Sequence, residues 1–165
     1  MDTHITSTID ASSQDLLGYF LRRVSSPEDA ADLLGETLLV LWRRADDLPA
    51  EPLEARLWMF GIARRVLSTY RRAGLRRVAL ADRLRLELEV RTSASERSTE
   101  GEELHALLLE LDLLDQEIIR LVHWEGFSLA EVATILARRP GTIRSRYARA
   151  RTSLRKAIDD QNGGL

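Results

Sequence analysis

The sequence predicts an all-α protein made of two small helical domains joined by a linker, the second containing a helix-turn-helix. Prolines occur only at positions 27, 49, 52 and 140, each where an element should begin or end. No stretch shows the sustained apolar/polar alternation that is typical of a β-strand. With 165 residues, of which 44% are apolar, the chain can bury one moderate core or two small ones.

Three helices are expected in the first domain, residues 1–77. Ser26 is a suitable N-cap for a helix that begins at Pro27, because serine accepts the unpaired amides of a first turn and proline fits its first position. We expect Gly74 to end the third helix, since glycine favours the left-handed conformation found at helix C-termini. The expected helices cover about residues 14–24, 27–45 and 54–72, with a proline-rich loop at 48–53.

The linker is placed at residues 78–101. Its second part, 91–101, is rich in serine, threonine and glutamate and has little apolar surface to bury. Its first part, 78–90, also has a pattern that is compatible with a helix.

The second domain, residues 102–165, is expected to contain four helices. Ser128 and Glu131 have the Ser-x-x-Glu spacing of a capping box directly before an apolar run. Pro140 can begin the next helix without removing a needed backbone donor. Two helices joined by so short a turn form a helix-turn-helix, whose second helix can enter the DNA major groove. The expected helices cover about residues 102–111, 115–124, 128–137 and 140–157.

The last helix has one apolar face and one face suited to DNA. At 100° per residue, the inward arc contains Ile143, Tyr147, Ala150 and Leu154. The opposite face carries no carboxylate, whereas a merely solvated helix normally interleaves Glu with Arg. Small residues allow close approach to bases, and arginines and hydroxyls can contact bases or phosphates. The opposite face holds Gly141, Thr142, Arg144, Ser145, Ala148, Arg149 and Thr152, flanked by Arg138, Arg139, Arg146 and Arg151.

A second basic stripe lies in the first domain. Residues 64–77 contain six arginines and no acid, although the net charge of the chain is only −2. Segregated blocks of this kind indicate separate surfaces with separate partners, or else solvated faces. Two basic stripes on separate domains favour one nucleic acid that is contacted at two places. The stripe comprises Gly61, Arg64, Arg65, Ser68, Arg71 and Arg72.

The acidic helix that begins at Pro27 has an unusual leucine. Leu39 projects away from the core stripe, among Asp32, Glu36 and Arg43. An exposed leucine ringed by charges indicates a protein-binding patch, and the alternative is an isolated surface leucine without a role. The tryptophans lie beside apolar stripes and are expected to anchor the core, with Trp58 the first candidate for an exception: Trp42, Trp58 and Trp124.

Several function classes are excluded by composition. The chain has no cysteine, which removes disulfides, thiolate metal sites and cysteine nucleophiles. Its histidines, at 4, 105 and 123, lack metal-binding spacing, and no phosphate-binding glycine loop or nucleophile elbow is present. We therefore expect no enzyme, no cofactor and no metal ion. The absence of a long apolar run and of a signal peptide predicts a cytoplasmic protein without membrane insertion.

Two blocks of the chain together resemble an extracytoplasmic-function (ECF) sigma factor, a promoter-specificity subunit of bacterial RNA polymerase. The segments SSPEDAADLLGETLLVLWRRADDL and EARLWMFGIARRVLSTYRR are similar to sigma region two. The segment LDLLDQEIIRLVHWEGFSLAEVATILARRPGTIRSRYARARTSLRKAI is similar to region four. Region three is absent, as in the family, and the linker takes its place.

The resemblance implies a role for each surface. It implies that Asp32, Glu36, Leu39 and Arg43 dock on the beta-prime clamp helices of core RNA polymerase, and that the beta flap is a further contact. It implies that the loop at 48–56 and the helix after it recognise the −10 element and capture a flipped base. Arg64, Arg65, Ser68, Arg71 and Arg72 then lie near single-stranded promoter DNA. The last helix would read the −35 element through Arg138, Arg139, Thr142, Arg144, Ser145, Arg146 and Arg149. An anti-sigma factor is an expected partner.

The chain departs from the family pattern at four positions. Arg65 replaces a common Asn, so the identity of the flipped base does not carry over. Ala137 and Arg138 replace the usual glycine and apolar residue of the turn, and Arg139 cannot cap the last helix by accepting a bond. The alternative function is an autonomous helix-turn-helix regulator or an adaptor that is not a polymerase subunit.

Overall fold

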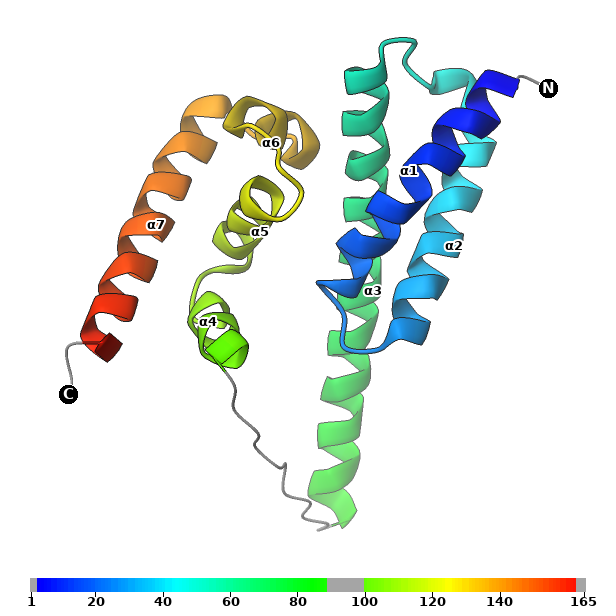
Figure 1. Ribbon diagram of the computed structural model, residues 1–165. Coiled ribbons are helices and arrows are strands. Elements are labelled where there is room, and N and C mark those ends of the chain that lie inside the picture. The colour runs from blue at the N-terminus through cyan, green and yellow to red at the C-terminus, as the bar shows by residue number, and fades with distance from the viewer. Residues whose placement is uncertain (1–2, 89–99, 163–165) are drawn as a thin grey trace. The chain divides into compact units, whose positions relative to one another are not determined.

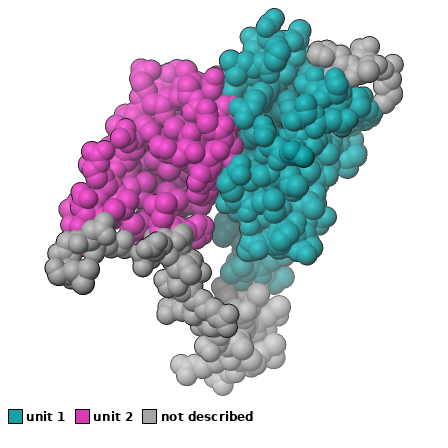
Figure 2. All heavy atoms as spheres, viewed as in Figure 1, with its two compact units in different colours: residues 1–92 teal, residues 93–165 magenta. Residues whose placement is uncertain are grey.

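The computed structural model describes residues 3–88 and 100–162, and within these ranges every regular element is a helix (Figure 1). The expected all-α class is confirmed. The chain divides into two compact units, Met1–Thr92 and Ser93–Leu165 (Figure 2). The first unit contains α1 (Thr3–Leu21), α2 (Pro27–Arg43), the short 3-10 helix η1 (Ala45–Asp47) and α3 (Pro52–Leu88). The second contains α4 (Glu100–Leu109), α5 (Leu113–His123), α6 (Leu129–Leu136) and α7 (Pro140–Asn162).

The core of the first unit forms where α1 packs against α2 and α3. Tyr19 and Phe20 are fully buried, and the Tyr19 ring lies edge-on to Phe20 and Phe60 with centroid distances of 5.2 and 5.5 Å. From α2, Leu33 and Leu41 fill the same core. Each such side chain contributes about 1.5–3 kcal/mol on burial. This packing fixes which faces of α2 and α3 point to solvent.

The start of α2 follows the predicted capping. The Ser26 hydroxyl accepts the Asp29 amide at 3.2 Å, and Pro27 is the first helical residue. Further along, the buried Thr37 hydroxyl donates to the Leu33 carbonyl at 2.7 Å, so this polar group is satisfied inside the core. The apolar side of α2 is therefore the side that carries Ala30, Leu33, Thr37 and Leu41.

Helix boundaries in the first unit differ from the expected ones. The prediction that α1 begins near residue 14 is wrong, because the helix already runs from Thr3 and buries Ile9 as well as Leu16. Several Ser and Thr residues at positions 3–13 hid this helix, since they have low intrinsic helix preference and tertiary packing overrides it. At the other end, α2 stops at Arg43, and η1 follows, closed by a 2.8 Å bond from Arg44 Nε to Asp47.

The prediction that α3 ends at Gly74 is also wrong. Gly126 has the one positive φ among the described glycines, so Gly74 does not adopt the left-handed conformation of a helix cap. A glycine inside a helix costs only about 1 kcal/mol, and the leucines, alanines and arginines that follow favour helix. Residues 78–88, assigned to the linker, therefore continue α3, which Figure 1 shows extending past α1 and α2. Residues 89–99 of the expected linker lie outside the described residues.

The second unit contains the four helices expected, with shifted ends. Asp112 caps α5 by accepting the Leu114 amide at 2.8 Å. The capping box of α6 is confirmed, because Ser128 Oγ accepts the Glu131 amide at 3.2 Å while the Glu131 carboxylate accepts the Ser128 amide at 2.8 Å. The start of α7 at Pro140 is as expected, although the helix continues to Asn162 rather than ending near 157.

The turn between α6 and α7 has an alanine in an unfavourable conformation. Ala137 adopts φ 51° and ψ 48°, the left-handed region that usually holds glycine. The amides of Ala137 and Arg138 both return to the carbonyl of Ala133, the latter at 3.0 Å, which satisfies the end of α6. The turn of the helix-turn-helix thus has the usual left-handed C-cap geometry, but alanine occupies the position that glycine usually takes.

Candidate nucleic-acid interfaces

The outer face of α7 presents the predicted DNA-reading side chains together. Ile143 and Ala150 are buried, and Tyr147 and Leu154 are half-buried, so the predicted inward arc is confirmed. The opposite face is fully exposed and carries no carboxylate. None of its arginines is ion-paired within the described part of the chain, and the Ser145 hydroxyl donates to the Thr142 carbonyl at 3.1 Å. The exposed predicted residues are Arg138, Arg139, Thr142, Arg144, Ser145 and Arg149.

Arg146 differs from the other predicted residues of α7. Its side chain is only 22% exposed and points to the start of α5. The guanidinium bonds Asp115 through Nε at 2.7 Å and Asp112 through Nη2 at 3.0 Å. The structure therefore places Arg146 between the two helices.

The basic stripe of α3 lies on the side of the helix away from the core. Met59, Ile62, Ala63 and Leu67 are buried on the inner side. The stripe has both exposed and half-buried members, and Arg64 Nε is buried with no hydrogen-bond partner among the described residues. Arg65 and Arg72 are exposed, whereas Arg64, Ser68 and Arg71 are half-buried.

A cavity of about 380 Å³ lies beside the loop before α3. Pro49 and Ala50 line it from the loop, and Pro52, Ala55, Arg56 and Met59 line it from the first turns of α3. The remaining lining residues come from α1 and include three hydroxyl side chains, Ser7, Thr8 and Ser12. Sequence reasoning missed them because it began α1 too late. Ile9 and Leu16 are seven residues apart, which places them on one face of a helix, and this spacing was the available signal.

The outer face of α2 carries two large apolar side chains. Leu39 is 57% exposed, and Trp42, one turn further on, is 44% exposed. Asp32, Glu36 and Arg43 are exposed on the same helix, as predicted. The expectation that Trp42 anchors the core is wrong, because Leu41 occupies the inward position. Its three-residue spacing from Leu39 was the signal that placed both on one face.

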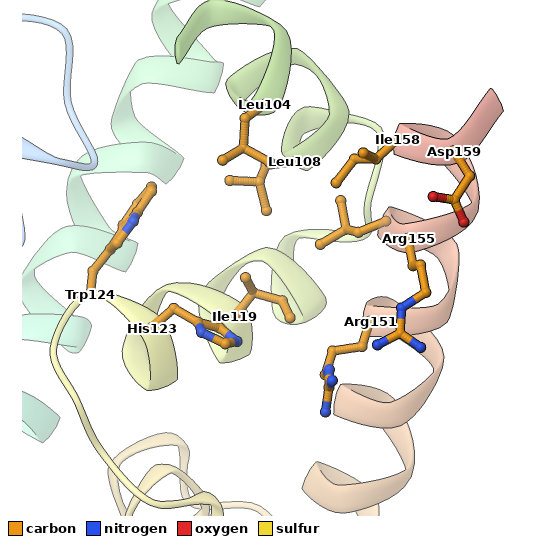
Figure 3. Close-up of a pocket in the computed structure, with 10 residues that line it drawn as sticks. Leu104, Leu108, Ile119, His123, Trp124, Arg151, Arg155, Ile158 and Asp159 are labelled. Atoms are coloured by element: carbon orange, nitrogen blue, oxygen red, sulfur yellow. The ribbon is translucent and has the colours of Figure 1, made fainter. Parts of the chain in front are cut away.

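An apolar groove of about 430 Å³ lies in the second unit between α4, α5 and α7 (Figure 3). Leu104, Leu108 and Ile119 line it together with Leu154 and Ile158. Its rim holds charged and aromatic side chains, namely His123, Trp124, Arg151, Arg155 and Asp159. Trp124 is 40% exposed beside this groove, so the expectation that it anchors the core is wrong as well.

Comparison with known proteins identifies the family to which the chain belongs. The family models described as Sigma-70 region 2 and Sigma-70, region 4 match residues 8–77 and 101–154. The ECF RNA polymerase sigma factor EcfG of Rhodopseudomonas palustris is 31% identical over 145 residues, which cover 87% of this chain and 79% of EcfG. The chain belongs to the ECF sigma factor family. As an alternative sigma factor it binds core RNA polymerase and promoter DNA and directs transcription initiation.

Other ECF sigma factors extend the similarity over nearly the whole chain. SigL of Mycobacterium tuberculosis is 29% identical over 159 residues, covering 92% of this chain and 86% of SigL. The fold is also similar to that of the sigma factor RpoE of Bartonella quintana, solved in complex with the anti-sigma factor NepR. That comparison has a TM-score of 0.73 at 24% identity and covers 96% of this chain and 98% of the other.

Each matched region of this ECF sigma factor contains one of its two basic helix faces. Region 2 includes the exposed face of α2, the cavity beside the loop and the stripe of α3, while region 4 includes the helix-turn-helix.

Within the described residues, no helix has the length and apolarity needed to cross a membrane.

Proposed function

We propose that this sigma factor acts in the cytoplasm through four separate surfaces, two for polymerase and two for promoter DNA. The observation that carries the proposal is that each unit has its own basic helix face, which is exposed on α7 and partly exposed on α3. An autonomous helix-turn-helix regulator needs only the face on α7. The second basic face, on α3, fits a subunit that holds a promoter at two places.

The first polymerase surface is the outer face of α2. Leu39 and Trp42 supply a small apolar centre, and Asp32, Glu36 and Arg43 form a charged rim around it. Protein interfaces combine a desolvated apolar centre with a polar rim, and tryptophan is enriched at their energetic centres. This face is proposed to dock on the beta-prime clamp helices.

The −10 surface is the outer side of α3 with the loop before it. Single-stranded DNA binding needs cations along the backbone and a place for an unstacked base. Arg64, Arg65, Arg71 and Arg72 supply the cations, with the Ser68 hydroxyl between them, and the 380 Å³ cavity beside the loop supplies a hollow at the start of the same helix. Unstacking a base costs a few kcal/mol, which these contacts offset.

The −35 surface is the outer face of α7 and the turn before it. Arginine pairs in a bidentate manner with guanine in the major groove, and hydroxyls contact bases or phosphates. The proposed contacts are Arg138, Arg139, Thr142, Arg144, Ser145 and Arg149, all of which are exposed.

The remaining partners are proposed to use apolar surface on the second unit. The groove between α4, α5 and α7 is open, apolar and rimmed by Arg151 and Arg155, which suits an amphipathic helix with acidic residues. We assign the beta flap contact to this groove. An anti-sigma factor would inhibit the protein by covering such polymerase-binding surfaces.

The decisive experiment adds the purified chain to core polymerase and measures initiation at a promoter mapped after overexpression. Initiation that requires both the chain and the mapped promoter supports the proposal, with core polymerase alone and a template lacking the promoter as controls. Specific DNA binding by the chain alone, together with no initiation at any mapped promoter, would instead support the autonomous regulator.

A further inference from the structure

Arg146 joins the DNA-reading helix to the start of α5. Its Nε donates to Asp115 at 2.7 Å and its Nη2 lies 3.0 Å from Asp112, so one guanidinium bridges two carboxylates. The Arg146 and Asp115 side chains are only 22% and 20% exposed. A charge-assisted pair with this geometry is more specific than an exposed ion pair, which contributes little.

Both carboxylates are themselves held in place. Asp112 is the N-cap of α5 and accepts the Leu114 amide at 2.8 Å. This amide, and secondarily Arg146, lower the pKa of Asp112 below its ordinary value. Asp115 lies in the first turn of α5, where the helix dipole favours negative charge. Arg146 is therefore attached to the rigid N-terminus of a helix.

The next residue of α7 makes a contact with the opposite end of α5. The Tyr147 hydroxyl lies 3.1 Å from His123 Nε2, and the two rings stack with centroids 5.9 Å apart. Since His123 is the last residue of α5, consecutive residues of α7 are bonded to both ends of the same helix. Turning α7 about its axis would break both contacts together.

We propose that Arg146 is a positioning residue that fixes the rotation of α7, and that it does not contact DNA. This inference rests on the proposed −35 role of α7. Side-chain atoms lie about 5–6 Å from a helix axis, so a rotation of 10° moves them by about 1 Å. A displacement of this size exceeds the tolerance of about 0.5 Å within which a binding side chain must be held. The Arg146 bridge thereby sets where Arg144, Ser145 and Arg149 meet the groove.

The test compares promoter affinity of the reconstituted holoenzyme across salt concentrations for Arg146→Ala, Asp115→Asn and the double variant. A phosphate contact that is lost reduces the slope of log affinity against log salt by about 0.9. A positioning bridge predicts an unchanged slope. It also predicts that each single variant loses about tenfold or more in affinity, as for a damaged base contact, and that the double variant is no worse than the worse single variant.

Arg146→Lys discriminates further and serves if the alanine variant does not fold. Lysine keeps a charge for phosphate but lacks the planar fork that reaches two carboxylates. The positioning role therefore predicts that lysine fails to restore affinity. A reduced slope in Arg146→Ala, near-normal affinity in Arg146→Lys, or unimpaired binding by Asp115→Asn would each overturn the inference.

Arg149→Ala separates this inference from the proposed function. If Arg149→Ala leaves affinity and slope unchanged, the −35 role of α7 itself fails. If Arg149→Ala weakens binding, and Arg146→Ala weakens binding with a reduced slope, only the positioning role fails.

Discussion

Tyr70 of α3 donates a hydrogen bond of 2.9 Å to the carboxylate of Asp29 in the first turn of α2. The two residues are 41 positions apart, so this bond connects elements that are distant in sequence. The Asp29 amide is at the same time bonded to the Ser26 cap. The start of α2 is thus tied to α3, the helix that carries the basic stripe.

Replacing Tyr70 with phenylalanine should weaken the first unit. The ring is retained and only the hydroxyl is lost, so the free energy of unfolding should fall by about 1 kcal/mol, the usual net value of one hydrogen bond. Native-state hydrogen exchange of amides in α2 and α3 measures this change, and amides of the second unit serve as the internal control. Unaltered protection in α2 and α3 would show that the bond contributes nothing.

The contribution of the Tyr70 hydroxyl should also depend on pH. The hydrogen bond to Asp29, followed by burial, raises the pKa of Tyr70 above its ordinary value of 10.0. Because the pKa is raised on folding, the stabilisation is complete at pH values below the pKa of Tyr70 in the unfolded chain. It is lost as the pH rises through the pKa of Tyr70 in the folded protein. The stability difference between the natural chain and Tyr70→Phe should therefore be constant near neutrality and shrink above about pH 10. A difference that persists unchanged at pH 11–12 would contradict this.

Local chemistry determined which features of the fold could be predicted. The caps at Ser26 and at Ser128 with Glu131 depend on side chains within three residues, and both were found. Gly74 was misjudged because a glycine ends a helix only when the chain actually turns into the left-handed region there. The predicted start of α1 was too late for a related reason, because burial of Ile9, rather than local sequence, extends this helix toward the N-terminus.

The site residues show the same division. Helical periodicity was sufficient to place Leu39 outside the core and Ile143 inside it. It could not identify the partner of Arg146, because the carboxylates of Asp112 and Asp115 are more than 30 positions away and meet α7 only through folding. Likewise, Trp42 is as apolar as a core residue, and only the packed structure shows that Leu41 takes the inward position.

Leu39→Asp should impair binding to core polymerase while leaving the fold intact. Leu39 is 57% exposed, so a charge there costs the isolated protein little, but it would place a carboxylate in an apolar contact. We expect a loss of more than about 1 kcal/mol in binding free energy, as for a central interface residue. A competition assay against unmodified protein for core polymerase measures it.

The matched control for Leu39→Asp is Leu75→Asp. Leu75 is 69% exposed on α3 of the same unit and lies outside the proposed docking face. It should leave polymerase affinity unchanged. Normal binding by folded Leu39→Asp, or equal losses for both variants, would remove the docking role of this face.

Arg149→Ala should weaken promoter use through the −35 element. Arg149 is exposed on the outer face of α7, and loss of a bidentate base contact costs about 1–3 kcal/mol. Footprinting or affinity measurement with holoenzyme checks this, using a template whose −35 element is scrambled as the reference. Lys156→Ala, which also removes one exposed positive charge from α7 but lies two turns further on, should have a smaller effect. Equal affinity for Arg149→Ala and the natural protein would exclude Arg149 from the interface.

Ala137→Gly should stabilise the second unit. Ala137 has φ 51°, and the left-handed conformation costs a residue with a Cβ about 1–2 kcal/mol. Glycine removes that cost but loses about 0.4–1 kcal/mol through the greater freedom of the unfolded chain. The free energy of unfolding measured from exchange of α6 and α7 amides should therefore rise by roughly 0.5–1 kcal/mol. Ala106→Gly, at an exposed position inside α4, should do the opposite and cost about 1 kcal/mol. If both glycines destabilise equally, the turn conformation imposes no strain on Ala137.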